Sequence, residues 1–347
     1  MAAAPSRALL ISANVGTLFE EYQALAETWL SAIAKVSQKR SNLAHTPDPN
    51  AHMRPFGACQ AIEAANPGFV ALHMQELGGK AYQDGIANVD NFAQVLLEHL
   101  PPGMFDRSLA ILDDSGQSPS FTPWTRKGFS ITRWRLNEQP TAFINSHLFH
   151  DASNMTALKT SPSQYALCRQ QALQYTVDAI TQPDEDTFLF GDLNFRLALK
   201  DALPVLAQRL KCVEKKVDVA DGGEKSVVLR DANGDDCLCV TAKSFLLKDK
   251  ERIFYEERGE SMRPFDVEGT MLPSGYTECP ITFPPTYPYQ EDLARPCEFL
   301  EKRCPAWCDR IIMSSEAETR AISASYGVIG LDVCMGDHKP VMLTIQL

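Results

Sequence analysis

Short apolar runs recur along the chain, and several of them end in a polar residue or a glycine. Runs of this length are typical of β-strands, and a run without polar positions is typical of a buried strand. The strands predicted in this way span residues 8–14, 68–74, 128–136, 141–148, 186–192, 310–314, 321–326 and 341–346. Because 128–136 and 141–148 follow one another closely, they are expected to pair antiparallel through a turn at 137–140.

Longer segments between these runs carry apolar residues at the helical spacing. They predict helices over 19–36, 82–100 and 161–180, with Ser161 as the N-cap of the last helix and Pro162 in its first turn. Strands and helices therefore alternate, but hairpin-like pairs interrupt a purely parallel order. The pattern predicts an α/β fold with mixed sheets.

Two segments fit neither period. Residues 41–60 contain several prolines and are expected to form an inserted surface loop. Residues 201–266 are rich in charge and combine helical patches with glycine-containing turns. Candidate site residues come from both ends of the chain, so residues 1–347 are expected to form a single domain.

The charge balance limits the partners of the protein. Lys and Arg number 33 against 44 Asp and Glu, which gives a net charge of −11. Long nucleic acid is therefore not an expected partner, and a phosphate-bearing ligand needs a locally basic pocket. No stretch approaches the ~20 apolar residues of a membrane helix. We expect a monomeric cytoplasmic protein, with peripheral contact at the plasma membrane left open.

Two short segments carry the candidate chemistry. Residues 191–196 and 303–310 each place carboxylate and guanidinium groups close together. A carboxylate can hold a metal or take a proton from water, and arginine binds phosphate in a bidentate manner. Residues 336–340 add an imidazole, that of His338. The combination indicates a metal-dependent phosphoesterase.

Polar residues also stand at the ends of the predicted strands, where α/β folds usually place their sites. They are Asn14, Glu76, His147, Asp192, Asn194, Asp309, Asp337 and His338. Taken singly, each has a structural explanation. Glu76 could be a turn carboxylate and Asp192 with Asn194 an Asx turn. Their coincidence along one chain favours a common site.

These segments resemble the inositol polyphosphate 5-phosphatase family. Its Gly-Asp-x-Asn-Phe/Tyr-Arg and Pro-Ala/Ser-Trp-Cys/Thr-Asp-Arg blocks are matched at 191–196 and 305–310. Within the family, residues 13–20, 147–154 and 283–289 are similar to type I members. The resemblance implies a DNase I-like (endonuclease/exonuclease/phosphatase) fold, a four-layer αββα sandwich with two mixed sheets.

The resemblance also implies how the site works. Glu76 would hold Mg²⁺, with Asn14 and Asp337 near the same shell, because hard oxygen ligands suit this cation. The catalytic set would be Asp192, which orients and deprotonates water, Asn194 and His147, which bond water or phosphate, and Asp309, which favours the His338 imidazolium. Phosphate binding would fall to Arg196, Arg310, Lys127, Arg303 and His150.

The implied reaction is Mg²⁺-dependent removal of the 5-phosphate from inositol 1,4,5-trisphosphate and inositol 1,3,4,5-tetrakisphosphate, which terminates inositol phosphate and calcium signalling. Lipid-hydrolysing members typically carry a lysine where this chain has Pro288, so a soluble substrate is favoured. A phosphoinositide lipid 5-phosphatase, a nuclease of the same fold and an inositol phosphate binding module without turnover remain the alternatives.

Overall fold

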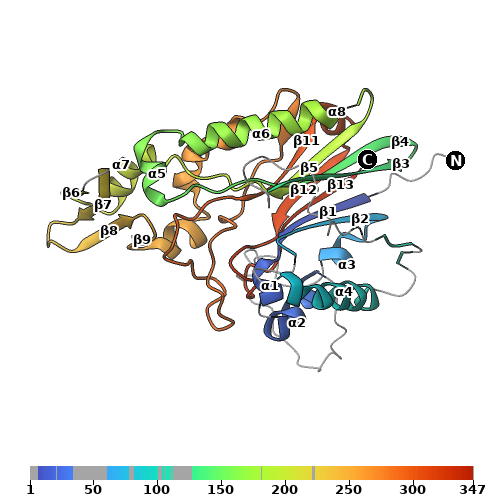
Figure 1. Ribbon diagram of the computed structural model, residues 1–347, viewed down its shortest axis with the longest axis horizontal. Helices are drawn as coiled ribbons and strands as arrows, with labels where there is room; N and C mark the ends of the chain where they lie inside the picture. Colours follow the sequence, from blue (N-terminus) through green and yellow to red (C-terminus); the bar gives the residue numbers. More distant parts are fainter. Residues whose placement is uncertain are drawn as a thin grey trace, which may run out of the picture.

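The computed structural model describes residues 7–20, 22–33, 61–77, 82–100, 104–105, 107–109, 111, 127–180, 182–220 and 223–346. Two β-sheets pack face to face, and helices cover the outer side of each (Figure 1). The surface loop predicted over 41–60 lies outside the described residues.

The first sheet has the strand order β12-β13-β1-β2. Its strands are β1 (Arg7–Asn14), β2 (Phe69–Gln75), β12 (Ser323–Val328) and β13 (Val341–Gln346). Because β1 runs parallel to β2 and antiparallel to β13, the sheet is mixed. The helices on its outer face are α1 (Gly16–Glu20), α2 (Tyr22–Ile33), α3 (Ala61–Ala65) and α4 (Tyr82–His99).

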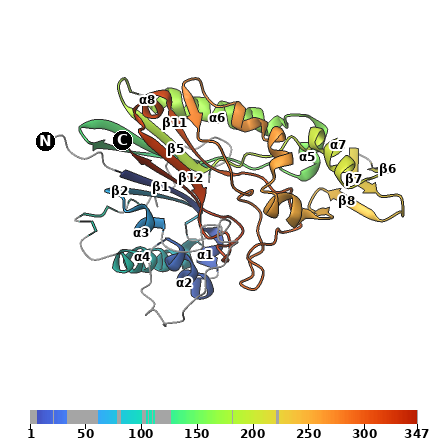
Figure 2. The same ribbon diagram turned by 180° about the vertical axis from the view of Figure 1, so that it is seen from behind.

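The second sheet has the order β10-β11-β5-β4-β3. Its strands are β3 (Gly128–Leu136), β4 (Gln139–His147), β5 (Asp186–Asp192), β10 (Tyr276–Glu278) and β11 (Asp309–Ser314). Here β4 and β5 are parallel and the other pairs antiparallel. Helices α6 (Gln164–Ile180) and α8 (Ser315–Arg320) lie outside it (Figure 2). The predicted sandwich with two mixed sheets is confirmed.

Burial on both faces explains why the strands appear as unbroken apolar runs. Along β1, Leu10 packs between the sheets with Phe143 and Phe190, whereas Leu9 packs towards the helices with Trp29. A strand covered on both sides has no polar face, so the alternation of half-exposed strands is missing. The sequence pattern therefore locates the strands but does not reveal which sheet each one joins.

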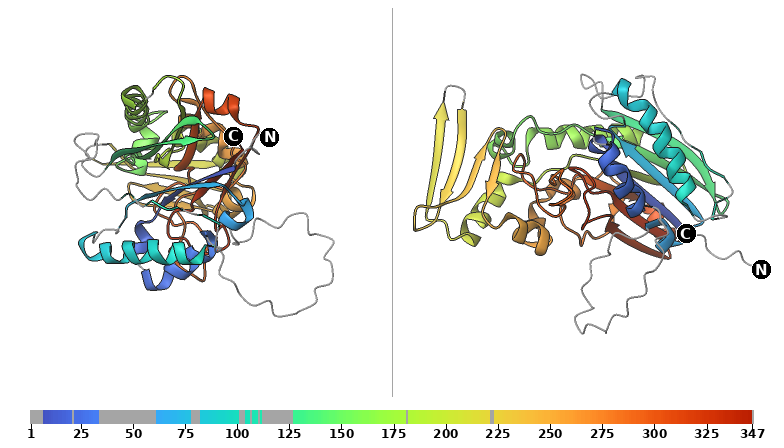
Figure 3. Two further views of the ribbon diagram at one scale, coloured as in Figure 1. Left: turned by 90° about the vertical axis from the view of Figure 1, so that its right-hand side faces the viewer. Right: turned by 90° about the horizontal axis from the view of Figure 1, so that it is seen from below.

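A third sheet extends from one end of the sandwich (Figure 3). It consists of β6 (Glu214–Ala220), β7 (Gly223–Arg230), β8 (Asp236–Thr241) and β9 (Phe245–Leu247), all antiparallel. In the described residues between 199 and 270, helix is limited to α7 (Leu199–Arg209) and to three short turns at Arg252–Glu256, Glu260–Phe265 and Val267–Thr270. Residues 201–266 therefore contain helical patches, as expected, but residues 214–247 form a sheet that the sequence did not predict, because exposed charges conceal apolar positions that join the main core.

Two helices also differ from expectation, one in its first residue and one in being additional. Ser161 was predicted to cap α6, but the helix begins at Gln164, and it is Ser163 whose Oγ accepts the Ala166 N–H, at 3.3 Å. Residues 154–159 form an additional helix, α5 (Asn154–Lys159), capped by Ser153.

The predicted β3–β4 hairpin is confirmed, with positive φ at Asn137 and Glu138 in its turn.

No helix in the described part of the chain is long and apolar enough to cross a bilayer.

His73 makes the fold sensitive to acid. Its ring stacks on Phe190 at a centroid distance of 3.8 Å, and its Nδ1 is buried. Burial lowers the pKa of His73 to about 3, against a weaker opposing effect of backbone hydrogen bonds at Phe190 and Ile144. The unfolded chain takes up this proton near the ordinary pKa of 6.5, so the folded state loses stability as pH falls from 6.5 towards 3.

We therefore expect His73→Phe to flatten the acid limb of the stability curve. Over this range the slope should fall by roughly 1.4 kcal/mol per pH unit, the value of one proton. Urea unfolding of both proteins between pH 4 and 8 measures the difference. Parallel curves would contradict the assignment.

Candidate active site

Strand register brings the predicted residues to one end of the sandwich. In the second sheet, His147, Asp192 and Asp309 are direct partners on three neighbouring strands, β4, β5 and β11. In the first sheet, Asn14 stands opposite Gln75 at the ends of β1 and β2. Asn14 Nδ2 donates to Asp192 Oδ2 at 3.0 Å, which links the two sheets.

Asp192 is buried at the centre of this group. The His147 Nε2 atom lies 3.3 Å from its Oδ2 and the His338 Nε2 atom 3.9 Å. Burial alone would raise the pKa of Asp192, but the charges of His338 and His147 outweigh it and hold that pKa well below its usual range. Asp192 is therefore ionised at neutral pH and able to accept hydrogen bonds from water.

Gly191 makes this position possible. An added Cβ there would lie 1.7 Å from the Ser146 carbonyl oxygen on β4. Only glycine lets the two strands approach as they do, so the first residue of the 191–196 block serves packing and not chemistry.

His338 and Asp309 form a buried pair, with His338 Nδ1 2.8 Å from Asp309 Oδ2. Burial lowers the pKa of an imidazole, but the Asp309 and Asp192 carboxylates outweigh this effect and raise the pKa of His338 to about 10. The ring is consequently an imidazolium at neutral pH, with Nε2 on the side of Asp192.

Glu76 and Asn14 supply oxygen atoms at the end of the first sheet. The Glu76 side chain is 46% exposed, and its Oε1 lies 3.3 Å from Lys127 Nζ. Burial would raise the pKa of Glu76, but His147 and Lys127 reverse this, so its pKa is lowered overall. A Cβ on Gly16 would lie 2.9 Å from Glu76 Oε2 and 3.5 Å from Asn14 Oδ1, so glycine keeps this cradle open. Such oxygen donors fit a hard divalent cation.

Asp337 lies beside this cradle. Its Oδ1 accepts a hydrogen bond from Thr17 Oγ1 at 3.1 Å, and the same hydroxyl is 3.1 Å from Glu291 Oε1. Among the described residues, the group of His and carboxylate side chains whose possible metal-binding atoms all lie within 4.8 Å of one another consists instead of Asp192, Asp309 and His338. The metal role of Asp337 stays a prediction.

Cationic side chains form a rim around the carboxylates. This cationic rim consists of the cations Lys127, Arg196 and Arg303 together with two imidazole side chains, those of His147 and His150. Burial lowers the pKa of His150, and so do the charges of Arg196, Lys127 and Arg303, which places His150 among these three cations. The rim supplies the local positive field that a chain of net charge −11 needs in order to bind phosphate.

Arg310 does not belong to this rim, and its predicted contact with substrate is wrong. The guanidinium is 2% exposed and bound by two carboxylates, with Nε 2.8 Å from Glu278 Oε1 and Nη1 2.9 Å from Asp266 Oδ2. Successive residues of a strand point to opposite faces, so Arg310 points away from the side occupied by Asp309. Arg310 is a structural residue.

Asn194 holds the loop after β5. Its backbone N–H donates to Asp192 Oδ1 at 3.0 Å, its side-chain amide donates to the Leu148 carbonyl at 2.9 Å, and its Oδ1 accepts from Arg196. The Asx turn considered from the sequence is therefore present. It connects the loops that follow β4 and β5.

Sequence reasoning missed two residues that contact this set. The Tyr287 ring lies 4.6 Å from the His338 ring, and the Arg196 Cζ atom lies 4.6 Å from the Tyr287 ring centre. The Thr286 hydroxyl oxygen accepts the backbone N–H groups of Cys308 and Asp309 at 3.1 and 3.2 Å. Both residues belong to segment 283–289, whose sequence indicates similarity to type I members but no contact with the site.

Cysteine chemistry is disfavoured at this site. Cys304 and Cys308 are buried, and burial raises the pKa of each thiol well above its usual range, despite the opposing charge of Arg196. A buried, protonated thiol is a poor nucleophile.

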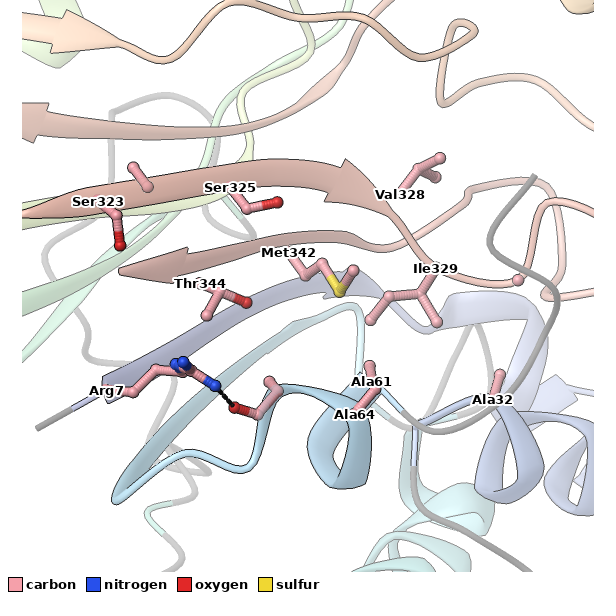
Figure 4. Close-up of a pocket in the computed structure, with 13 residues that line it drawn as sticks. Arg7, Ala32, Ala61, Ala64, Ser323, Ser325, Val328, Ile329, Met342 and Thr344 are labelled. Carbon is pink, nitrogen blue, oxygen red and sulfur yellow. Dashed lines mark hydrogen bonds between the residues drawn. The ribbon is translucent and has the colours of Figure 1, made fainter. Parts of the chain in front are cut away.

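A pocket of about 340 Å³ lies elsewhere, between α3 and the outer face of β12, β13 and β1 (Figure 4). Arg7 is the charged residue in its lining, and its Nη1 donates to the Ala65 carbonyl at 2.6 Å. None of the predicted site residues lines this pocket. The predicted site residues lie instead at the ends of the strands of the two main sheets.

Comparison with known proteins identifies relatives of this chain. Residues 258–344 match the endonuclease/exonuclease/phosphatase family 2. The chain is 32% identical over 419 residues to inositol polyphosphate-5-phosphatase A of Homo sapiens, a similarity that covers 100% of this chain and 95% of the human protein. It is 26% identical to a probable type I inositol 1,4,5-trisphosphate 5-phosphatase of Caenorhabditis elegans, covering 98% and 99% of the two chains.

A solved structure shares the fold. It is the inositol polyphosphate 5-phosphatase domain of SPsynaptojanin in complex with inositol (1,4)-bisphosphate and a calcium ion. The TM-score is 0.51 at 14% identity, with 98% of this chain and 84% of that chain covered. The likeness confirms the endonuclease/exonuclease/phosphatase architecture.

Proposed function

This chain belongs to the inositol polyphosphate 5-phosphatase family and is a phosphoric monoester hydrolase, and from this premise we propose that it removes the 5-phosphate of inositol 1,4,5-trisphosphate in a Mg²⁺-dependent reaction. Inositol 1,3,4,5-tetrakisphosphate is the second proposed substrate. The observation that carries the proposal is the buried Asp192 carboxylate, which lies between His147 and the His338–Asp309 pair and next to the cationic rim.

Glu76 and Asn14 are the proposed ligands of the metal, because their oxygen atoms flank the open cradle at Gly16. When bound, Mg²⁺ neutralises charge on the phosphate and on the leaving oxygen. The calcium ion in the SPsynaptojanin complex supports a divalent cation in this family.

The protein side chains perform the remaining steps. Asp192 accepts a hydrogen bond from the attacking water and takes its proton, and the water attacks phosphorus in line with the leaving oxygen. The new P–O bond forms as the bond from phosphorus to the inositol 5-oxygen breaks, and that oxygen takes up a proton from solvent. The imidazolium of His338 and the ring of His147 donate hydrogen bonds to phosphoryl oxygens as negative charge builds on them. Phosphoryl transfer relies mainly on such positioning and charge stabilisation.

A soluble substrate is favoured over a lipid. Pro288 follows Tyr287 where lipid-hydrolysing relatives typically carry lysine, so one cation for a phosphoinositide headgroup is missing. We further propose that residues 1–347 act as a single monomeric catalytic domain in the cytoplasm and end the calcium signal carried by inositol 1,4,5-trisphosphate.

Phosphate release decides the proposal. Purified protein is incubated with inositol 1,4,5-trisphosphate, inositol 1,3,4,5-tetrakisphosphate or inositol 1,4-bisphosphate, which has no 5-phosphate. The first two are expected to release phosphate with Mg²⁺, and EDTA is expected to abolish release until Mg²⁺ is restored. Absence of release from both, with Mg²⁺ present, would refute the function.

The alternatives are tested in the same series. Vesicles containing phosphatidylinositol 4,5-bisphosphate test lipid activity, and supercoiled plasmid tests nuclease activity. A higher kcat/KM on the vesicles than on the soluble trisphosphate would favour a lipid phosphatase, and plasmid nicking would favour a nuclease. Binding of the trisphosphate without phosphate release would support a binding module.

A further inference from the structure

A buried ion network lies behind part of the cationic rim. The Arg169 side chain, on α6, is fully buried. Its Nε and Nη2 donate to the two carboxylate oxygens of Glu268 at 2.7 and 2.6 Å, and its Nη1 donates to Asp151 Oδ1 at 2.9 Å. Bidentate pairing of this kind fixes orientation as well as distance.

The network connects two loops of the site. Arg169 Nη1 also donates to the Phe149 carbonyl at 3.0 Å, next to His150 in the loop after β4. Glu268 Oε1 also accepts the backbone N–H of Arg196 at 2.9 Å, in the loop after β5. One ion pair therefore sets the spacing between His150 and Arg196.

Asp151 extends the network towards the rim. Its Oδ1 is occupied by Arg169 and by Ser163, while its Oδ2 is buried without a partner among the described residues. Asp151 lines a small cavity together with Arg196 and Arg303, and its negative charge acts on both guanidinium groups. It pairs directly with Arg169, and it adds negative charge near two rim arginines.

We propose that Arg169 and Glu268 are positioning residues for substrate binding: they hold the two loops so that His150 and Arg196 meet the substrate phosphates in fixed relative positions. The inference rests on the proposed function, because it takes those side chains as substrate ligands. Groups held in place lose less freedom on binding, so loosening them weakens affinity. Asp192 and His338 are held by other contacts, so turnover of bound substrate is affected less.

The first test compares two buried glutamates. Glu268→Gln removes the negative charge of Glu268 from the network. Glu185→Gln is the matched control, since Glu185 is also buried and pairs with Arg133 at 3.0 Å. Glu185 directly precedes β5 and so lies at the end of that strand opposite the site. For inositol 1,4,5-trisphosphate we expect Glu268→Gln to raise KM about tenfold, equivalent to about 1.4 kcal/mol, with kcat within about threefold of wild type. Glu185→Gln should leave both constants within about twofold. An equal rise of KM in the two variants would overturn the proposal.

A double variant separates positioning from stability. Arg169→Met with Glu268→Met removes the bidentate pair and leaves Asp151 as the one remaining charge of the network, so folding stability should recover relative to Arg169→Met alone, which leaves two buried carboxylates without their cation. The Arg196 N–H still lacks its acceptor, so KM should stay raised. Return of KM to the wild-type value together with the melting temperature would show a purely structural role and overturn the inference.

Hydrogen exchange provides a measurement that does not depend on the reaction. The Arg196 amide should exchange about tenfold faster in Glu268→Gln than in wild type or in Glu185→Gln, because its acceptor is weakened. If the wild-type protein released no phosphate from the trisphosphate, the proposed function would fail and this comparison alone would decide the positioning role. Unchanged exchange in Glu268→Gln would overturn it.

Discussion

Asp192→Asn is expected to lower kcat for inositol 1,4,5-trisphosphate by about 10³-fold, within the range of general-base catalysis. Asparagine has nearly the same shape, and its amide can still contact Asn14. It cannot accept a proton from water, and it removes the negative charge that faces His147 and His338. Phosphate release at saturating substrate measures the effect.

Asp186→Asn is the matched control for this experiment. Asp186 begins the same strand that Asp192 ends, is equally buried and is also ion-paired, in its case with Arg320. Its loss should change the melting temperature without changing kcat by more than about twofold. Near wild-type kcat in Asp192→Asn would remove that residue from the reaction.

The second large effect is expected at the His338–Asp309 pair. His338→Gln should lower kcat by about 10² to 10³-fold, since glutamine cannot carry the positive charge that faces the phosphoryl oxygens. Asp309→Asn should lower kcat by a smaller factor, about 10 to 10²-fold, because the imidazole remains but loses the carboxylate that orients it and keeps it protonated.

A double-mutant cycle tests whether the two residues act as a unit. In the His338→Gln background, Asp309→Asn should have little further effect on kcat, because the group on which Asp309 acts is gone. If Asp309→Asn lowered kcat by the same factor in both backgrounds, Asp309 would act independently of His338 and its assigned role would be wrong.

The strands and the mixed sheets could be predicted because burial on both faces leaves unbroken apolar runs. The pairing of His147, Asp192 and Asp309 could not, since it depends on the strand order β4-β5-β11 and this order is not encoded locally. The third sheet was missed for a related reason. Its many exposed charges hide the apolar positions that face the core.

Arg310 illustrates a different failure. A motif shows which groups are close in sequence, whereas the two-residue period of a strand sends neighbouring side chains to opposite faces. Because Asp309 and Arg310 are successive residues of β11, this period puts their side chains on opposite faces, so only one of them can face the site. The network of Arg169, Glu268 and Asp151 is harder still to predict from the sequence, because it joins Asp151 and Arg169 to a residue 99 positions beyond Arg169.

The pairing of β1 with β13 has a consequence for synthesis of the protein. The first described strand is flanked on one side by the last, with Arg7 opposite Gln346, and these two strands lead to and from Asn14 and His338. While the chain is being made, β1 lacks this neighbour until residues 341–346 have been translated. The reacting groups therefore come together only after the segment that carries His338 and β13 has been made, so a nascent chain that stops before it has no assembled site.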